Sequence, residues 1–247
     1  MKYLRLAISF LTVFPVYRKV ASEKEMAASL YCYPLVGFLL GGLLALAAYA
    51  QMRLSLGTAG DVLIVVIWII LTGGLHLDGL MDSADGLFSG RDRERKLEIM
   101  KDSRVGAMGA IALAAVFLMK VSFLGLMPYP LKYWVLLLAP AAGRGMMLLP
   151  IAYYPYARPG PGLGRAFGSK ASRLAWPLAM LLTGAAAFLG TGPGLLAGGL
   201  LITALIGIVV ARVISTSLGG HTGDTYGALC EFTEMVFLLV VGIGLHI

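Results

Sequence analysis

Long runs of apolar residues constrain this chain more than any other feature of its sequence. They recur from residue 34 to the C-terminus with no long polar linker between them. Of the 247 residues, 59% are hydrophobic and 13% are charged, whereas about a quarter of a soluble domain is usually charged. Runs of this kind are typical of helices that cross a bilayer. The sequence therefore predicts one all-α, polytopic membrane domain over residues 1–247.

Seven of these runs are candidate membrane-spanning helices. About 20 residues are needed to cross a bilayer, so the second and the last of the seven look short. Ahead of them, Leu4, Ile8 and Leu11 recur at helical spacing, which predicts a short N-terminal helix lying in the membrane interface. No small-residue cleavage site follows this helix, which argues against a signal peptide. The seven runs are residues 34–50, 62–75, 107–126, 133–151, 174–190, 194–211 and 235–247.

Basic residues predict which side of the membrane each connection faces. They concentrate in the N-terminal segment and in two later segments, whereas two of the connections between these hold only Arg53 and Lys132. Lys and Arg are enriched in cytoplasmic loops, so residues 76–106, 152–173 and 212–231 are predicted to face the cytoplasm with the N-terminus. This indicates a protein of the cytoplasmic (inner) membrane. The net charge of +7 has the same origin, and no nucleic-acid-binding motif accompanies it.

Acidic residues gather in one segment, with seven of the 13 between Asp78 and Asp102. Asp78, Asp82 and Asp85 stand at i, i+4 and i+7, which puts three carboxylates on one face of a helix. Three like charges so close together repel one another, and a divalent cation resolves that conflict. Hard oxygen ligands suit Mg²⁺, or Mn²⁺ in its place. We predict that these three side chains bind such an ion, rather than forming a solvated acidic helix end.

A basic segment follows the three aspartates. Residues 91–100 are interpreted as an amphipathic helix with a solvated face that includes Arg93. A break before this helix allows it to turn back, which returns Asp102 to the predicted metal. Lys101 and Arg104 then supply positive charge for phosphate oxygens.

Two further features are candidate substrate contacts. Gly220, Asp224 and Thr225 belong to a glycine-rich turn whose backbone N–H groups could donate to a bound phosphate, although an ordinary interhelical turn is the alternative. Arg144 is a lone guanidinium in the apolar run 139–150. We interpret it either as the buried partner of one of the acids or as a phosphate contact.

These motifs resemble those of the cobalamin synthase family, also called adenosylcobinamide-GDP ribazoletransferases. The resemblance lies in residues 72–86 (TGGLHLDGLMDSADG), 97–106 (LEIMKDSRVG) and 218–227 (LGGHTGDTYG), with Glu231 and Glu234 after them. The sequences SFLT and FP near the N-terminus also fit the family, so the similarity covers nearly the whole chain. His221 stands where Gln is commonest, which argues against a direct catalytic role for His221.

The resemblance implies a Mg²⁺-dependent transferase in a late step of vitamin B12 synthesis. Such an enzyme moves the adenosylcobinamide phosphate moiety of adenosylcobinamide-GDP onto α-ribazole, or its 5′-phosphate, and releases GMP. A hydroxyl that attacks a diphosphate needs a metal at the phosphates, which agrees with the predicted carboxylate site. One of Asp82 and Asp85 is our candidate for accepting the hydroxyl proton. We expect the bilayer as a partner, and leave open a homo-oligomer and contacts with other corrinoid-pathway enzymes.

The predicted site residues fall into three groups. The metal ligands are Asp78, Asp82 and Asp85. The catalytic residues are Asp82, Asp85 and Asp102. The substrate-binding residues are His76, Lys101, Arg104, Arg144, Gly220, Asp224 and Thr225.

Two other classes of membrane protein remain as alternatives. CDP-alcohol phosphotransferases also carry several Asp residues at a membrane face, but the spacing usual in that class is missing from this sequence. A cation-coupled transporter could use intramembrane acids and glycine-interrupted spans. Against it, the acids cluster at one face, and no internal repeat is evident. Release of GMP distinguishes the three classes.

Overall fold

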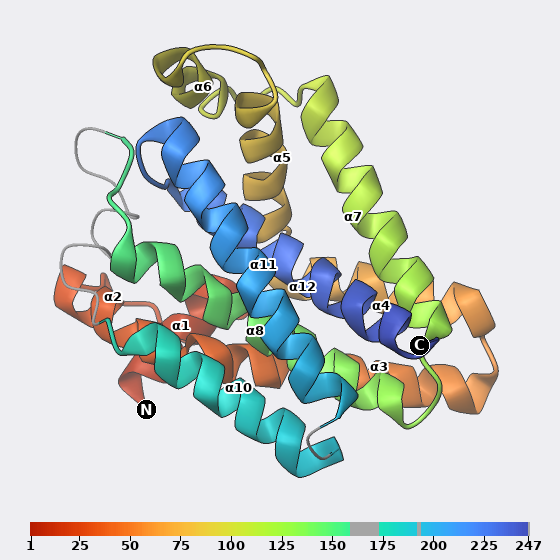
Figure 1. The fold of residues 1–247 in the computed structure, drawn as a ribbon. Helices are drawn as coiled ribbons and strands as arrows, with labels where there is room; N and C mark the ends of the chain where they lie inside the picture. Colours follow the sequence, from red (N-terminus) through yellow and green to blue (C-terminus); the bar gives the residue numbers. More distant parts are fainter. Residues whose placement is uncertain (159–172, 192–193, 247) are drawn as a thin grey trace.

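The structure is a computed structural model that describes residues 1–158, 173–191 and 194–246. The regular elements of this part of the chain are helices (Figure 1). In chain order they are α1 (Lys2–Leu11), α2 (Glu23–Ser29), the 3-10 helix η1 (Leu30–Cys32), α3 (Tyr33–Leu54), α4 (Gly57–Thr72), α5 (Leu75–Leu87), α6 (Arg93–Ile99), α7 (Ala107–Leu126), α8 (Leu131–Tyr153), α10 (Ala175–Thr191), α11 (Leu195–Leu218) and α12 (Gly223–Gly244).

Five helical segments are long and apolar enough to cross a membrane. They are Glu23–Leu54, which joins α2, η1 and α3, and the helices α7, α8, α11 and α12. The helices α4 and α5 reach this length only as a pair, which makes a sixth candidate span. The apolar helix α10 is 17 residues long and falls short. The predicted all-α, multi-pass architecture is confirmed, with five or six candidate spans in the described residues where the sequence indicated about seven.

A sharp bend divides the run that the sequence predicted as one span over residues 62–75. Gly73 and Gly74 have φ angles of +63° and +71°, a left-handed backbone that glycine adopts without steric cost. Across this pair the helix axis turns by 92° from α4 to α5. Figure 1 shows α5 standing away from the bundle, with α6 at its outer end and α7 beside it. The three aspartates therefore lie on a separate helix rather than on the end of a straight span.

The last helix is longer than predicted. It begins at Gly223 rather than near residue 235 and runs for 22 residues. Its start is fixed by a capping box, in which the Thr222 hydroxyl accepts from the Thr225 N–H and the Thr225 hydroxyl accepts from the Thr222 N–H. The acids Glu231 and Glu234 lie inside this helix, so an apolar run in the sequence marks only its second half. The second polar motif thus occupies the N-terminal half of α12.

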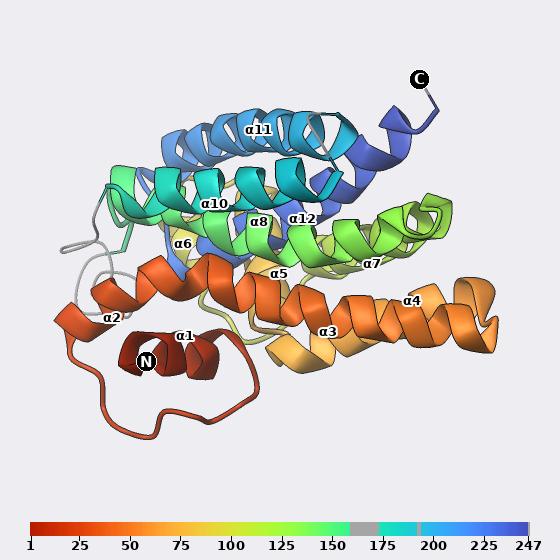
Figure 2. The same cartoon turned by 90° about the horizontal axis from the view of Figure 1, so that it is seen from below.

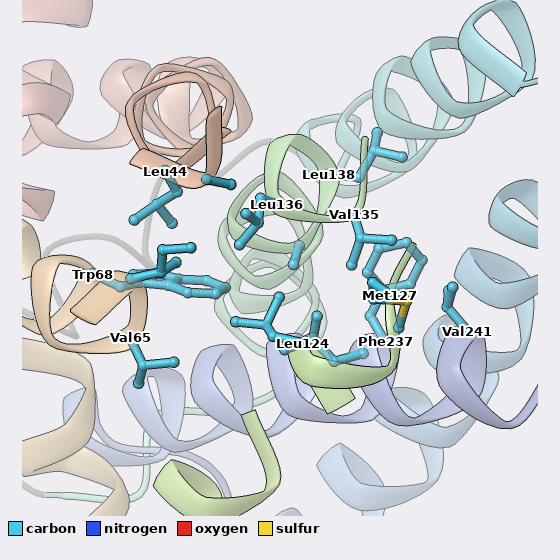
Figure 3. Close-up of a cluster of buried hydrophobic side chains, with 14 of the residues drawn as sticks. Leu44, Val65, Trp68, Leu124, Met127, Val135, Leu136, Leu138, Phe237 and Val241 are labelled. Atoms are coloured by element: carbon cyan, nitrogen blue, oxygen red, sulfur yellow. The ribbon is translucent and has the colours of Figure 1, made fainter. Parts of the chain in front are cut away.

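The central helix of the bundle is α8, which is buried at every residue over 138–151. It packs against α3, α10, α11 and α12, as Figure 2 shows from below. The largest core cluster combines buried side chains of seven helices, among them Leu44, Trp68, Leu136 and Phe237 (Figure 3). Lipid tails are as apolar as these side chains, so close van der Waals packing rather than burial from water holds such helices together.

The N-terminal helix α1 forms as predicted and packs on α2 and α3. Leu6, Ala7 and Leu11 are its buried residues. Its location in the membrane interface stays a prediction.

Candidate active site

The two polar motifs meet where α5 crosses α12. A Cβ added at Gly79 would lie 2.6 Å from the carbonyl oxygen of Asp224, and one at Gly227 would lie 3.1 Å from the Cα of His76. Because neither residue has a side chain, the two helix backbones touch. This contact sets Asp78 and Asp82 of α5 beside Asp224 of α12, although almost 150 residues separate them in sequence.

Asp78, Asp82 and Asp224 form a surface that we call the acid face. The carboxylate of Asp82 is repelled by those of Asp78, Asp224 and Asp85, and is attracted by Arg158. Asp78 is exposed, whereas Asp82 and Asp224 are half-buried. Arg158 donates to Asp224 Oδ2 at 2.6 Å and to the carbonyl oxygen of Met100 at 3.3 Å. Among the described residues, one guanidinium between these carboxylates leaves an excess of negative charge.

Asp85 has a different set of partners from the one predicted. Its two carboxylate oxygens accept the backbone N–H groups of Gly106 and Gly109, each at 2.8 Å. These N–H groups belong to the first turn of α7, where a helix carries partial positive charge and unsatisfied donors. Asp85 therefore caps α7 and ties it to α5. A catalytic role for Asp85 stays a prediction, and the geometry gives it a positioning role.

The acid face suits a magnesium ion, but not through the three ligands that the sequence suggested. Within the described residues, no group of three or more His, Cys, Asp or Glu is arranged to hold a metal ion. Mg²⁺ usually keeps several waters and is bound by one or two carboxylates together with substrate phosphates. The all-oxygen donors of Asp78, Asp82 and Asp224 fit such an ion. We therefore expect one or two of Asp78, Asp82 and Asp224 to bind the ion together with substrate phosphates, in place of the three protein ligands that the sequence predicted.

Asp102 and Arg104 pair with each other instead of reaching the acid face. The Arg104 guanidinium donates from Nε to Asp102 Oδ1 at 3.0 Å and from Nη2 to Asp102 Oδ2 at 2.6 Å. This pairing lowers the pKa of the Asp102 carboxyl to about 2. Both residues lie on the loop between α6 and α7, as does the exposed Lys101. The prediction that the loop returns Asp102 to the metal is not supported, because Asp85 makes the connection between α5 and α7.

The helix α6 is anchored, which corrects the interpretation of Arg93 as part of a solvated face. Arg93 donates from Nε to the carbonyl oxygen of Leu218 at 2.7 Å and from Nη2 to that of Ala157 at 3.1 Å. Lys96 donates to Ser217 Oγ at 2.8 Å. The carbonyl of Leu218 ends α11, so Arg93 caps that helix. These contacts join α6, the end of α11 and residues 154–158 beside the acid face.

The glycine-rich turn between α11 and α12 is closed by internal hydrogen bonds. The N–H of Gly220 donates to the carbonyl oxygen of Ser215, and the N–H of His221 donates to the carbonyl oxygen of Pro155. The N–H of Thr225 donates to the Thr222 hydroxyl. A backbone cradle for phosphate needs free N–H groups, so Gly220 and Thr225 lack the donors that the sequence suggested. The structure shows the alternative, an interhelical turn. Direct substrate contacts by these two residues stay predictions without geometric support.

His221 is a structural residue of this turn. Its ring lies between Tyr154 and Tyr226, with Nε2 3.0 Å from the carbonyl oxygen of Ala211. Burial lowers the pKa of His221 to about 4, so the imidazole is neutral at physiological pH. The sequence analysis argued against a direct catalytic role for His221, because Gln is commonest at this position in the family. The buried, neutral ring agrees with that prediction.

A buried charge network lies beneath the site. Lys120 of α7 donates to Glu231 at 2.7 Å and to Glu234 at 2.5 Å, and Arg144 of α8 pairs with the other oxygen of Glu234. Lys120 also lies 4.1 Å from the centre of the Trp68 ring. Arg144 is 0% exposed, so it is the buried partner of an acid rather than a phosphate contact. The sequence analysis missed Lys120, although two acids one turn apart in an apolar helix indicated that a cation must face them.

A pocket of about 190 Å³ adjoins the acid face. Asp78, Asp224, His76 and two tyrosines, Tyr33 and Tyr226, are the lining residues with polar side-chain groups, and the rest of the wall is aliphatic, phenylalanine or glycine. His76 is 2% exposed, and its Nδ1 lies 3.3 Å from Arg144 Nη2. The pocket, the acid face and the charge network are therefore contiguous.

Comparison with known proteins agrees with this arrangement. A family model described as cobalamin-5-phosphate synthase matches residues 3–242. An adenosylcobinamide-GDP ribazoletransferase of Desulforamulus reducens is 51% identical over 97% of this chain and 96% of its own length. Proteins of the same name from Herpetosiphon aurantiacus and a Roseiflexus species are each 43% identical, over 97% and 94% of this chain and over 96% and 86% of their own lengths. No solved structure shows a significant match.

Proposed function

Since the chain belongs to the cobalamin-5-phosphate synthase family, we propose that it is an adenosylcobinamide-GDP ribazoletransferase. A ribose hydroxyl of α-ribazole, or of its 5′-phosphate, attacks the phosphorus that bears the cobinamide. The new P–O bond forms as the bond to GMP breaks, which yields adenosylcobalamin (or its 5′-phosphate) and GMP. The observation that carries the proposal is the acid face, which the crossing of α5 and α12 assembles from both family motifs.

The residues of the acid face divide the work of this reaction. One or two of Asp78, Asp82 and Asp224 would hold Mg²⁺ together with substrate phosphates, and the ion would supply positive charge to the diphosphate and the leaving GMP. Asp82, in the middle of the acid face, is our candidate for accepting the hydroxyl proton. Arg158 holds the Asp224 carboxylate in place, and Asp85 holds the start of α7 against α5. Lys101 and Arg104, on the exposed loop before α7, remain the candidates for supplying positive charge to phosphate oxygens, and Arg104 would exchange the Asp102 carboxylate for phosphate to do so.

The experiment that tests the proposal measures GMP released by the purified protein in lipid. Adenosylcobinamide-GDP, α-ribazole and Mg²⁺ are the additions, and GMP with an equal amount of adenosylcobalamin is the expected product. A CDP-alcohol phosphotransferase would instead act on a CDP-linked substrate, and a transporter would release no nucleotide. Absence of GMP with both α-ribazole and its 5′-phosphate would refute the proposed activity.

We propose that the acid face lies on the cytoplasmic side of the inner membrane. The support is the excess of Lys and Arg in the segments that surround it, compared with the connections that hold Arg53 and Lys132. Adenosylcobinamide-GDP carries a charged nucleotide, and a cytoplasmic site receives such a substrate without membrane passage.

Cysteine labelling tests this orientation. In a Cys32→Ala background, Glu94→Cys places a thiol on the exposed side of α6, and Thr58→Cys places one at the start of α4. A membrane-impermeant thiol reagent added to intact cells is expected to label Thr58→Cys and to spare Glu94→Cys. Two serines in the same predicted cytoplasmic segments are less suitable, because the Ser89 hydroxyl donates to the Gly86 carbonyl oxygen and Ser89 is half-buried, and Ser169 lies outside the described residues. Labelling of Glu94→Cys in intact cells would reverse the orientation.

Arg104→Lys tests the role of the loop before α7. A guanidinium grips two oxygens at once, which an ammonium cannot do, and one charge-assisted contact contributes about 1.5–3 kcal/mol. We expect kcat/KM for adenosylcobinamide-GDP to fall about tenfold or more. The control is Arg95→Lys, since Arg95 pairs with Glu98 on the exposed side of α6, whereas Arg93 caps α11 and is unsuitable. Equal losses in both variants would indicate a diffuse electrostatic field, and no loss in either would remove Arg104 from the site.

A further inference from the structure

The pocket next to the acid face has the size and lining of a site for one planar ring. Its volume of about 190 Å³ is a little larger than the 150 Å³ of an engineered cavity that binds benzene. Phe10 and Tyr226 contribute aromatic surface, and Met147 and Ile151 contribute aliphatic surface. A corrinoid macrocycle is far too large for this space. The occupant must be a small, flat and mostly apolar group attached to something that reaches the acid face.

One buried histidine gives this pocket a directional polar contact. A guanidinium can only donate hydrogen bonds, so the 3.3 Å contact from Arg144 Nη2 makes His76 Nδ1 an acceptor. The proton of the neutral imidazole then lies on Nε2. This Nε2 is buried and has no hydrogen-bond partner among the described residues. A buried donor without a partner is unfavourable, and the residue that carries this donor lines the pocket.

We infer that this pocket binds the benzimidazole base of the acceptor nucleoside, with His76 Nε2–H donating to the ring nitrogen that does not bear the ribose. The inference rests on the proposed function and assigns a subsite to one of its two substrates. Asp78 and Asp224 lie at the same pocket, so the ribose attached to the base extends toward the acid face, where its hydroxyl reacts. Arg144 acts as a positioning residue, because its pairing with Glu234 holds the guanidinium that sets the His76 tautomer.

Guanine, a purine base of the other substrate, fits the pocket less well. It carries two kinds of donor and three acceptors (O6, N7 and N3), and each needs a partner when buried. Beyond the carboxylates at the acid face, the wall is largely aliphatic and aromatic, and its side-chain donors are His76 and the hydroxyl groups of Tyr33 and Tyr226. A benzimidazole joined to ribose has one acceptor to satisfy and otherwise makes apolar contact, so it needs fewer polar partners from this lining than guanine does.

Paired nucleosides test the contact without changing the protein. Benzimidazole riboside and indole riboside have the same shape, but the indole has C–H in place of the accepting nitrogen. We expect the wild-type protein to use the benzimidazole riboside with about tenfold higher kcat/KM in GMP release, the effect of one neutral hydrogen bond. His76→Phe keeps a flat ring without the N–H and should abolish this preference, so that the ratio of the two kcat/KM values falls to about one. Met147→Leu changes the same pocket wall without changing a donor and should retain the preference.

Binding of the free bases provides a readout that does not depend on turnover. By calorimetry in detergent, benzimidazole should bind about tenfold more tightly than indole to the wild-type protein and to Met147→Leu, but equally to His76→Phe. Thermal unfolding checks that each variant is folded. Equal use of the two ribosides by an active wild-type protein would overturn the inference. So would a His76→Phe variant that keeps the preference and instead shows a raised KM for adenosylcobinamide-GDP, since that result would place guanine in the pocket. Absence of GMP release combined with selective binding of benzimidazole would refute the proposed reaction and leave the base-binding pocket standing.

Discussion

Replacing Asp82 by Asn is expected to lower the rate of GMP release at least about 100-fold while the protein stays folded and inserted. The substitution keeps the shape of the side chain and removes the charge at the centre of the acid face. A metal that neutralises phosphate oxygens stabilises the transition state by several kcal/mol, and each 1.36 kcal/mol changes a rate tenfold. Steady-state GMP release at saturating substrate measures the effect. Asp78→Asn should give a loss of the same order, because Asp78 belongs to the same face.

The matched control is Asp92→Asn, a second carboxylate change in the same polar segment. Asp92 caps α6 by accepting the Arg95 N–H at 2.9 Å, and Asn caps helices about as well as Asp. Its rate should stay within about twofold of wild type, as expected for a surface change that costs under 0.5 kcal/mol. Excess Mg²⁺ should partly restore Asp82→Asn, whereas Asp85→Asn should not respond, because Asp85 caps α7. A near-normal rate for Asp82→Asn at ordinary Mg²⁺ would remove the metal from the acid face.

The helices were largely predictable because each is an apolar run, whereas their directions were not. Hydropathy predicts α7 to the residue, since Lys120 is the one charged residue within its apolar run. It predicts a straight span through Gly73 and Gly74, because a hydropathy average carries no information on backbone angles. The start of α12 was missed for a different reason. Glu231 and Glu234 look like the end of a span until Lys120 and Arg144 are placed against them by other helices.

The candidate site was predictable as far as local spacing determines it. The i, i+4 spacing of Asp78 and Asp82 predicted correctly that they share a helix face, and the polar motif that includes Asp224 was identified. Helical spacing also grouped Asp85 with them, but the N-terminus of α7 takes that carboxylate. The partnership of Asp224 with α5 depends on a crossing of two helices, which no local pattern encodes. Arg158 gave no signal of its role either, because its partner lies 66 residues away.

Replacing Glu234 by Gln is expected to lower the free energy of unfolding by about 3–5 kcal/mol, the usual result of removing one partner from a buried ion pair. Glu234 is 0% exposed and faces two cations, Lys120 through one oxygen and Arg144 through the other. A neutral amide leaves Arg144 buried without a counterion. Thermal unfolding of the protein in one fixed lipid or detergent, followed by loss of the monodisperse peak on size-exclusion chromatography, measures the change.

Glu231→Gln is the matched comparison, because Glu231 is the same residue type one helical turn away and equally buried. Its contact is with Lys120 alone, and that ammonium retains Glu234 when Glu231 is neutralised. We therefore expect Glu231→Gln to lower the unfolding temperature clearly less than Glu234→Gln does. Glu234→Gln should also loosen Arg144 from His76 and so reduce the preference for benzimidazole over indole. Glu231→Gln should leave that preference unchanged. Equal destabilisation by the two substitutions would mean that the four charged residues stabilise the fold as one cluster. Glu234 would then not position Arg144 and His76 at the pocket more than Glu231 does.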